Sequence, residues 1–542
     1  MSGLQDTAAA SVTPETTLLV ERLLHPAAYP HPTQGIRLIE THISWVFLTG
    51  TYVYKVKKPC DLAFLDFTTL ERRRDFCREE VRLSGRFAPE LYLGAVPITG
   101  TFAEPHVDGV GEPIEWAVKL RQFDEAGRLD RVFADHRLSA DDCQRLGAEI
   151  AQVQAGLAVA DPASPWGTPQ AVMEAVALNL DQLRRWRSDA GPRADGLERW
   201  LRGQLETLAP AIDCRKTAGR IRECHGDLHL ANIVLHDGRM MAFDAIEFNA
   251  ALRWIDVAND IAFLAMDLEA RGRPDLAAHA VSSWIEAADD HDAARVLPVY
   301  MVYRAIVRAA VAAIRSSQMA AGGIQQAAAA CAETDRYLDL AERLTMPCRA
   351  VLFATSGVSG SGKTTIAARV VGQASAIRLR SDVERKRLAG MAATDRPATD
   401  DQTQSLYAPA TTRRVYERLA TLARTVLAAG TSVVVDAACN TRSQREVLAA
   451  VAREARVPLV WLDFEIPAEA LLARVTARQA AGTDASDASA DVVRTQLAAR
   501  EPIAAEEAST VPGPPPVRIV RITPASFDDP AFITRLLQEI GR

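Results

Sequence analysis

The sequence lacks paired cysteines, an excess of basic residues and a long apolar stretch free of charge. Its eight cysteines are scattered over 542 residues, and none forms a C-x-x-C pair. This spacing is typical of reduced, mostly buried thiols in a cytosolic protein. It argues against a disulfide framework and against a zinc site built from cysteine pairs.

Positive charge is not in excess either. The formal net charge is −7, which argues against general binding to nucleic acids or to anionic membranes. The most apolar helical stretch, VYMVYRAIVRAAVAAI, is interrupted by Arg304 and Arg308, so we expect no membrane span. The first residues contain no basic segment followed by an apolar one, so we expect no signal peptide. Together these features predict a cytoplasmic protein.

The length of the chain exceeds what one hydrophobic core can organise, since single cores stop growing near roughly 250–300 residues. No internal repeat is visible, so the two halves should have different folds. We expect a boundary in TMPCRA, near residues 345–350. The predicted regions are a flexible N-terminus at 1–24, a first domain at 25–344 with lobes at about 25–123 and 124–344, and a second domain at 349–542.

The two halves differ in their patterns. The first half begins with a hairpin signal around Thr49-Gly50, an amphipathic helix over 68–88 and a strand over 113–123, followed by mainly helical patterns. This is the order of a small kinase-type N-terminal lobe. In the second half, five apolar strand candidates alternate with helical stretches, which predicts a doubly wound parallel sheet.

The stretch HGDLHLANIVLHDGRMMAFDAIEF, residues 225–248, carries the first chemical signal. Phosphoryl transfer needs a carboxylate that orients the acceptor hydroxyl and oxygen ligands that hold magnesium against the phosphates. Asp227 is followed five residues later by Asn232, the offset of the protein-kinase catalytic loop, and Asp244 ends an apolar run. We predict Asp227 as catalytic base and Asn232 and Asp244 as magnesium ligands.

A zinc pair is the alternative interpretation of this stretch, because His225 and His229 are four residues apart. However, no glutamate lies between them, and Gly226 disfavours a helix there.

HGDLHLANIV with FDAIEF resembles the aminoglycoside phosphotransferase family, which includes choline and homoserine kinases and has a protein-kinase-like fold. The resemblance covers roughly residues 25–340. It implies that Lys55 pairs with the phosphates and with Glu80 on a helix, while Lys57, Lys58 and Glu79 are close enough in sequence to exchange these roles. It also implies that Asp256 and Asp260 brace the catalytic loop. Two features depart from the pattern: no G-x-G-x-x-G precedes the lysine, and no acidic cluster marks an aminoglycoside pocket.

GVSGSGKTT, residues 357–365, is the strongest single signal. It fits G-x-x-x-x-G-K-[ST], lies between an apolar strand and a helical pattern, and predicts an anion cradle of backbone N–H groups. Lys363 should bind the β- and γ-phosphates, and the Thr364 hydroxyl should bind magnesium. The predicted nucleotide-binding residues of this loop are Gly357, Gly360, Gly362, Lys363, Thr364 and Thr365.

Other charged residues of the second half lie where a P-loop site needs them. Asp436 ends an apolar strand, as a magnesium-binding Walker-B carboxylate does, and Asp382 follows the second strand. Arg474 and Arg478 precede the polar stretch QAAGTDASDASADV, which suits a mobile lid whose arginines neutralise the transferring phosphoryl group.

These residues of the second half resemble small P-loop kinases such as gluconate kinase, chloramphenicol phosphotransferase and zeta-toxin-type kinases. The resemblance covers roughly residues 349–542. It implies that Asp382 activates the acceptor hydroxyl and that Arg385 contacts the substrate.

The sequence therefore predicts an α+β protein-kinase-like bilobal domain followed by an α/β P-loop domain, with ATP and Mg²⁺ as cofactors and small-molecule hydroxyl acceptors. The leading hypothesis is a bifunctional phosphotransferase. Alternatives are a P-loop kinase with a regulatory first domain, an ATP-sensing switch, and a toxin-like kinase acting on a sugar nucleotide or a macromolecule. The acceptors, the choice of ATP or GTP and the oligomeric state are left open.

Overall fold

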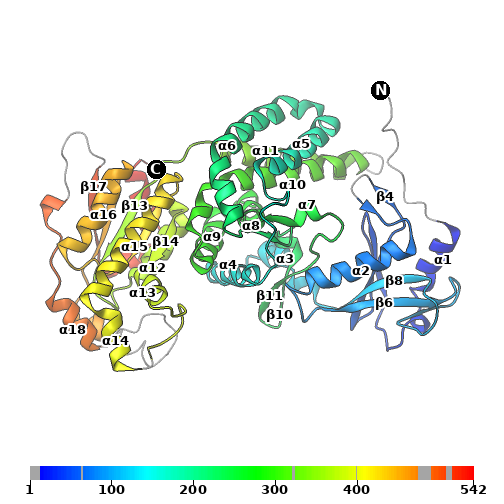
Figure 1. The fold of residues 1–542 in the computed structure, drawn as a ribbon, viewed down its shortest axis with the longest axis horizontal. Helices are drawn as coiled ribbons and strands as arrows, with labels where there is room; N and C mark the ends of the chain where they lie inside the picture. The colour runs from blue at the N-terminus through cyan, green and yellow to red at the C-terminus, as the bar shows by residue number, and fades with distance from the viewer. Residues whose placement is uncertain are drawn as a thin grey trace. The chain divides into compact units, whose positions relative to one another are not determined.

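Two sheets of opposite character organise the chain (Figure 1). The computed structural model describes residues 13–62, 65–319, 324–397, 399–473, 490–507 and 516–541. The residues group into two compact units. The first unit comprises residues 1–138, 153–174 and 212–264, and the second comprises 139–152, 175–211 and 265–542.

The first unit contains an antiparallel sheet of order β1-β2-β3-β8-β6-β7. The expected hairpin is formed by β2 and β3, and the expected helix is α2. Helix α2 begins after Thr69, and the Thr69 hydroxyl accepts the Arg72 N–H. The elements up to residue 134 are α1 (Pro14–Arg22), β1 (Arg37–Glu40), β2 (Ser44–Leu48), β3 (Tyr52–Lys57), β4 (Asp61–Leu62), β5 (Leu65–Asp66), α2 (Leu70–Ser84), β6 (Tyr92–Gly100), β7 (Pro105–Val107), β8 (Glu115–Arg121) and α3 (Leu129–Ala134).

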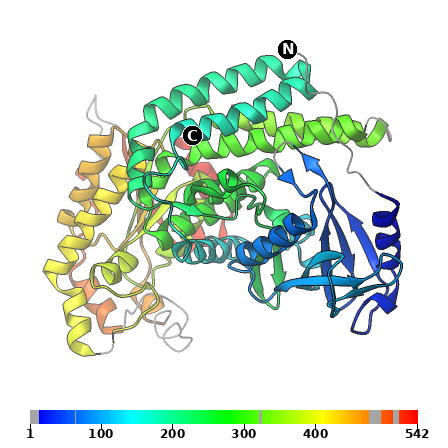
Figure 2. The same ribbon diagram turned by 45° about the vertical axis from the view of Figure 1, so that its right-hand side comes forward.

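Helices and short hairpin strands follow, as expected from the patterns. They are α4 (Ala140–Ala155), α5 (Pro169–Trp186), α6 (Gly191–Thr217), β9 (Ile221–Glu223), β10 (Ile233–His236), β11 (Arg239–Ala242), α7 (Ala250–Arg253), β12 (Trp254–Asp256), α8 (Val257–Ala270), α9 (Pro274–Ala288), α10 (Leu297–Met319) and α11 (Ile324–Leu344). The long helices α10 and α11 run side by side (Figure 2). Helix α10 is long and apolar enough to cross a membrane, but 72% of that stretch is buried within the fold, as in a core helix.

The second unit contains a five-stranded parallel sheet of order β14-β15-β13-β16-β17. Its elements are β13 (Leu352–Ser356), α12 (Lys363–Ala374), β14 (Ile377–Arg380), α13 (Ser381–Leu388), α14 (Asp400–Tyr407), α15 (Pro409–Ala428), β15 (Val433–Asp436), α16 (Arg442–Ala455), β16 (Leu459–Phe464), α18 (Ala490–Ala498), β17 (Val517–Ile522), α19 (Pro524–Asp528) and α20 (Phe532–Glu539). All five predicted strands form.

Both faces of the parallel sheet are covered. Phe353 and Val434 share one core with residues of α12 and α20, while Leu352 and Val435, which point the other way, are equally buried. The predicted fold class is confirmed. The strand order also matters for the site, because β13, which leads into GVSGSGKTT, lies directly beside β15, which ends at Asp436.

Candidate functional site

The first candidate site is built from β3, α2 and the 225–248 stretch, all within the first unit. The Lys55 Nζ donates to Glu80 Oε1 at 2.9 Å and to Asp244 Oδ1 at 2.5 Å. The Glu80 side chain is fully buried, whereas 46% of the Asp244 side chain is exposed. Asp244 can therefore reach a ligand while Glu80 can only hold the lysine.

Lys57 shares the same glutamate. Its Nζ donates to Glu80 Oε2 at 2.8 Å and also to Glu247 Oε1. Burial raises the pKa of Glu80, but the two lysines outweigh it and lower that pKa. Burial likewise lowers the pKa of Lys55, and the carboxylates around it, Asp244 first, raise it well above its ordinary value. Both lysines are thus held as cations.

The catalytic-loop residues are also brought together. The Asn232 Nδ2 donates to the Asp227 backbone oxygen at 3.0 Å and to Asp227 Oδ2 at 2.9 Å. This contact leaves the amide oxygen of Asn232 for a ligand. Gly226, with φ of +84°, has no room for a Cβ, which would lie 2.7 Å from the Leu252 oxygen. The glycine of HGD is therefore required by the backbone.

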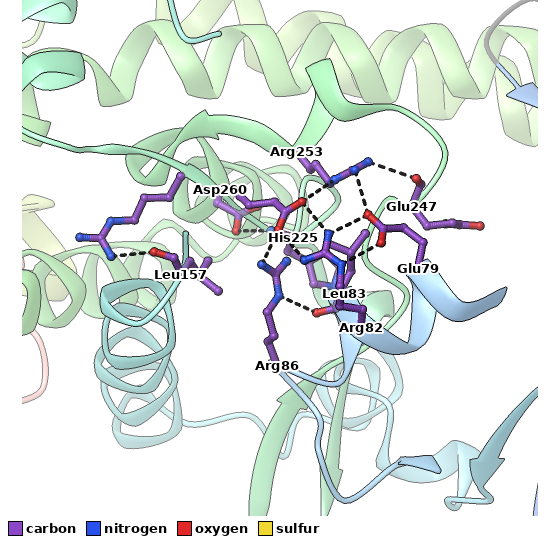
Figure 3. Close-up of polar contacts among 11 residues, drawn as sticks. Glu79, Arg82, Leu83, Arg86, Leu157, His225, Glu247, Arg253 and Asp260 are labelled. Carbon is purple, nitrogen blue, oxygen red and sulfur yellow. Dashed lines mark hydrogen bonds and ion pairs between the residues drawn. The ribbon is translucent and has the colours of Figure 1, made fainter. Parts of the chain in front are cut away.

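Asp260 braces this loop from α8. Its carboxylate accepts the N–H groups of His225 at 3.1 Å and Gly226 at 3.0 Å (Figure 3). The His225 Nε2 donates to the Phe243 oxygen at 2.9 Å, and burial lowers the pKa of His225. Asp256 instead binds Arg215, at 2.7 and 2.8 Å. His225 is thus a structural residue joining the two halves of the motif.

Sequence reasoning missed a cluster of ion pairs that fixes α2 (Figure 3). The Glu223 carboxylate, just upstream of His225, accepts from Arg82, Arg86 and Arg253 at 2.8–3.2 Å. Glu79 accepts from Arg82 and Arg253 as well. Since α2 also carries Glu80, these pairs hold the partner of Lys55 in place. The one hint of these ion pairs in the sequence was that two adjacent glutamates, Glu79 and Glu80, could both be the partner of the lysine.

We expect Glu223→Gln to lower the free energy of unfolding by about 3 kcal/mol, because three arginines lose a buried counter-charge. The pKa of Glu223 is lowered from 4.5 to about 2: burial raises it, but the arginine hydrogen bonds and charges outweigh burial. This stabilisation is therefore complete above pH 4.5 and is lost as the pH falls towards 2. Thermal unfolding across this range should show the gap between wild type and variant narrowing in acid.

The control is Glu104→Gln, which removes an exposed carboxylate of the same unit and should leave the unfolding temperature unchanged. A gap between wild type and Glu223→Gln that widens in acid would contradict the assignment.

The second candidate site surrounds the loop between β13 and α12. Gly360 and Gly362 have φ of +81° and +88°, and a Cβ on Gly362 would lie 2.5 Å from the Phe527 ring. Helix α12 begins directly after Gly362, and N–H groups at the start of a helix point towards whatever lies before it. Thr364 and Thr365 are exposed. The loop therefore has the shape of an anion cradle at a helix N-terminus.

A buried hydroxyl supports the fit of a phosphate here. The Ser361 Oγ is buried and has no hydrogen-bond partner among the residues that the structure describes. Buried polar atoms are rarely left without a partner, so a ligand oxygen would complete it. The Lys363 Nζ donates to the Val358 oxygen at 2.8 Å and so lies over the same loop, while Gly357 N–H donates to Ala438 at 2.8 Å.

The predicted acidic residues lie at the ends of two neighbouring strands, β14 and β15. Burial raises the pKa of Asp382; Arg385 and Lys363 lower it, and Asp436 raises it further. Asp436 and Lys363 thus both act on the charge of Asp382. Arg385 donates to the Leu406 oxygen at 2.8 Å and lies over the Tyr407 ring, while its Nε has no partner in the described part of the chain. Arg474 and Arg478 lie outside the described residues.

Comparison with known proteins gives two family matches. The phosphotransferase enzyme family matches residues 52–297, and the AAA domain family matches residues 352–503. The uncharacterized protein Rv2004c of Mycobacterium tuberculosis is 30% identical over 453 residues, which is 82% of this chain and 87% of that protein.

Solved structures resemble each half. A choline/ethanolamine kinase family protein from Mesorhizobium loti is 12% identical, with a TM-score of 0.35, over 60% of this chain and 99% of its own. A gluconokinase from Sinorhizobium meliloti is 22% identical, with a TM-score of 0.22, over 36% of this chain and 95% of its own. Both scores are low, so the family assignment depends on the sequence matches.

Proposed function

This chain belongs to the family of the mycobacterial protein Rv2004c and is a kinase with two kinase-type domains, and from that premise we propose that both domains are catalytically active. Each would transfer the γ-phosphoryl group of ATP to a hydroxyl of a small molecule. The observation that carries this proposal is the position of Lys55, whose Nζ contacts both buried Glu80 and exposed Asp244. This pair is the arrangement that positions ATP phosphates for transfer, so it supports a working first domain over one that binds no nucleotide.

In the first domain, Asp227 would orient the acceptor hydroxyl, and Lys55 would bind the phosphates. Asn232 and Asp244 supply the amide and carboxylate oxygens that Mg²⁺ prefers. In the second domain, the loop and Lys363 would hold the phosphates, Thr364 and Asp436 would hold Mg²⁺, and Asp382 would orient the acceptor. A Mg²⁺ ion held by these residues would neutralise negative charge on the phosphates.

The test is ATP turnover against a panel of hydroxylated metabolites, sugars, sugar nucleotides and aminoglycosides. Wild type, Asp227→Asn and Lys363→Ala are run side by side with Mg²⁺, and again with EDTA, which should stop all turnover. We expect each variant to lose a different acceptor. If Lys363→Ala removes all turnover and Asp227→Asn removes none, the first domain is a regulator and the bifunctional proposal is wrong.

A further inference from the structure

The end of helix α9 contacts β14 and α13, the elements on either side of the β14–Asp382 junction, and all three lie within the second unit. Ala278 of α9 belongs to the same hydrophobic core as Phe353 and Ile366 of the P-loop region. The Ser282 Oγ accepts the N–H of Arg378 in β14 at 3.0 Å. Helix α9 thus packs against the parallel sheet although it precedes the P-loop sequence by many residues.

Three arginines connect this helix to β14, to α13, which carries Asp382, and to α15. The Glu286 carboxylate accepts from Arg380 Nε at 2.8 Å and Nη2 at 2.5 Å. The Glu286 backbone oxygen accepts from Arg387 at 2.6 Å. Asp289, which caps α9, accepts from Arg418 of α15 at 2.7 and 2.9 Å.

We call Ser282, Glu286 and Asp289 the α9 anchor. Arg380 lies two residues before Asp382. The pKa of Arg380 is raised overall. Burial lowers it, but the neighbouring carboxylates, Glu286 first, outweigh burial. Arg380 is the register partner of Asp436 on the neighbouring strand β15, and Asp436 and Asp382 raise the pKa of Arg380 as well. If Glu286 lost its charge, Arg380 would be drawn towards them.

We propose that the α9 anchor positions the acceptor side of the P-loop site. Glu286 keeps Arg380 from pairing with Asp382, and Asp289 holds α15 through Arg418. The P-loop kinase is therefore completed by residues that lie within the segment matched by the phosphotransferase family, 52–297. This inference rests on the function proposed above, in which Asp382 orients the acceptor.

The test uses full-length protein and measures Lys363-dependent turnover, defined as the ATP consumption that Lys363→Ala removes. The acceptor is the panel compound that supports this rate, or water if none does. We expect Glu286→Gln to lower kcat about tenfold with an unchanged KM for ATP, because the acceptor side is disturbed and the phosphate cradle is not. The double variant Glu286→Gln/Arg380→Gln should recover at least about half of the lost activity, because the competing cation is gone.

The matched control is Glu454→Gln, which removes the same charge from an exposed pair with Arg424 and should leave kcat unchanged. If Glu286→Gln does not fold, Asp289→Asn is tested in its place, because asparagine tolerates the left-handed backbone at residue 289. We expect kcat of Asp289→Asn to fall about threefold.

A folded Glu286→Gln, or the replacement Asp289→Asn, with the wild-type kcat would overturn the proposed role of the α9 anchor. A double variant no more active than Glu286→Gln would overturn it as well. Absence of Lys363-dependent turnover from wild type would instead overturn the proposed function itself.

Discussion

Asp227→Asn should lower phosphoryl transfer by the first domain about 10³-fold, a loss within the range of a removed general base. Asparagine keeps the size of the side chain and the backbone oxygen that accepts from Asn232. It cannot accept the proton of an acceptor hydroxyl. We therefore expect kcat to fall while the KM for ATP changes little, which initial rates on the first-domain acceptor would measure.

The control for this variant is Asp237→Asn in the turn between β10 and β11. The Asp237 side chain is 84% exposed, and its left-handed backbone suits asparagine equally well. It should leave the rate unchanged. An Asp227→Asn protein with the wild-type rate would show that Asp227 is not the base.

Lys363→Ala should lower turnover by the P-loop domain by at least about 10²-fold, because the cation that stabilises charge on the transferring phosphoryl group is lost. Its ammonium group lies over the loop through the Val358 oxygen, and the adjacent Ser361 hydroxyl is buried without a described partner. The loss should therefore affect both kcat and nucleotide affinity, which turnover and titration with a fluorescent ATP analogue would measure.

The control is Arg424→Ala, which removes an exposed cation of the same domain, 45% exposed and paired with Glu454. It should behave as wild type in both measurements. First-domain turnover should also survive in Lys363→Ala, since Lys55 and Asp227 belong to the other unit. Full P-loop turnover without Lys363 would refute the assignment of the loop.

Local signals were enough to predict much of the fold. The strand ending at Asp436 is continuous valine, and its helix neighbours show regular periodicity, so short-range pattern and the alternation of strands and helices lead to a parallel sheet. The motif could be recognised because its residues are linked by local structure. The residues between Asn232 and Asp244 form a tight hairpin of β10 and β11, which brings the chain back to the level of Asn232.

The choice among lysines could not be made from sequence. Lys55 and Lys57 are two residues apart on β3 and so face the same side. Both contact Glu80, and they differ only in the second carboxylate, Asp244 for Lys55 and Glu247 for Lys57. That difference depends on how the chain returns some 190 residues later, for which no local pattern exists.

The ion pairs of Glu223 and of Glu286 were missed for the same reason. Their arginine partners are 141 and 94 residues away in sequence, at Arg82 and Arg380. A charged residue on a helix or a strand looks like a solvated one until its partner is known. Buried ion pairs between distant elements therefore have no signature in a single sequence.

The interleaved units have a consequence for how the protein is made. Residues 139–152 and 175–211 leave the ribosome early, yet the remainder of their unit begins only at residue 265. Helices made in the first half of synthesis must therefore keep apolar faces uncovered until later segments emerge, when aggregation competes with folding. We expect the nascent chain to need chaperones longer than two kinases joined end to end would. Truncation before residue 265 should yield insoluble fragments.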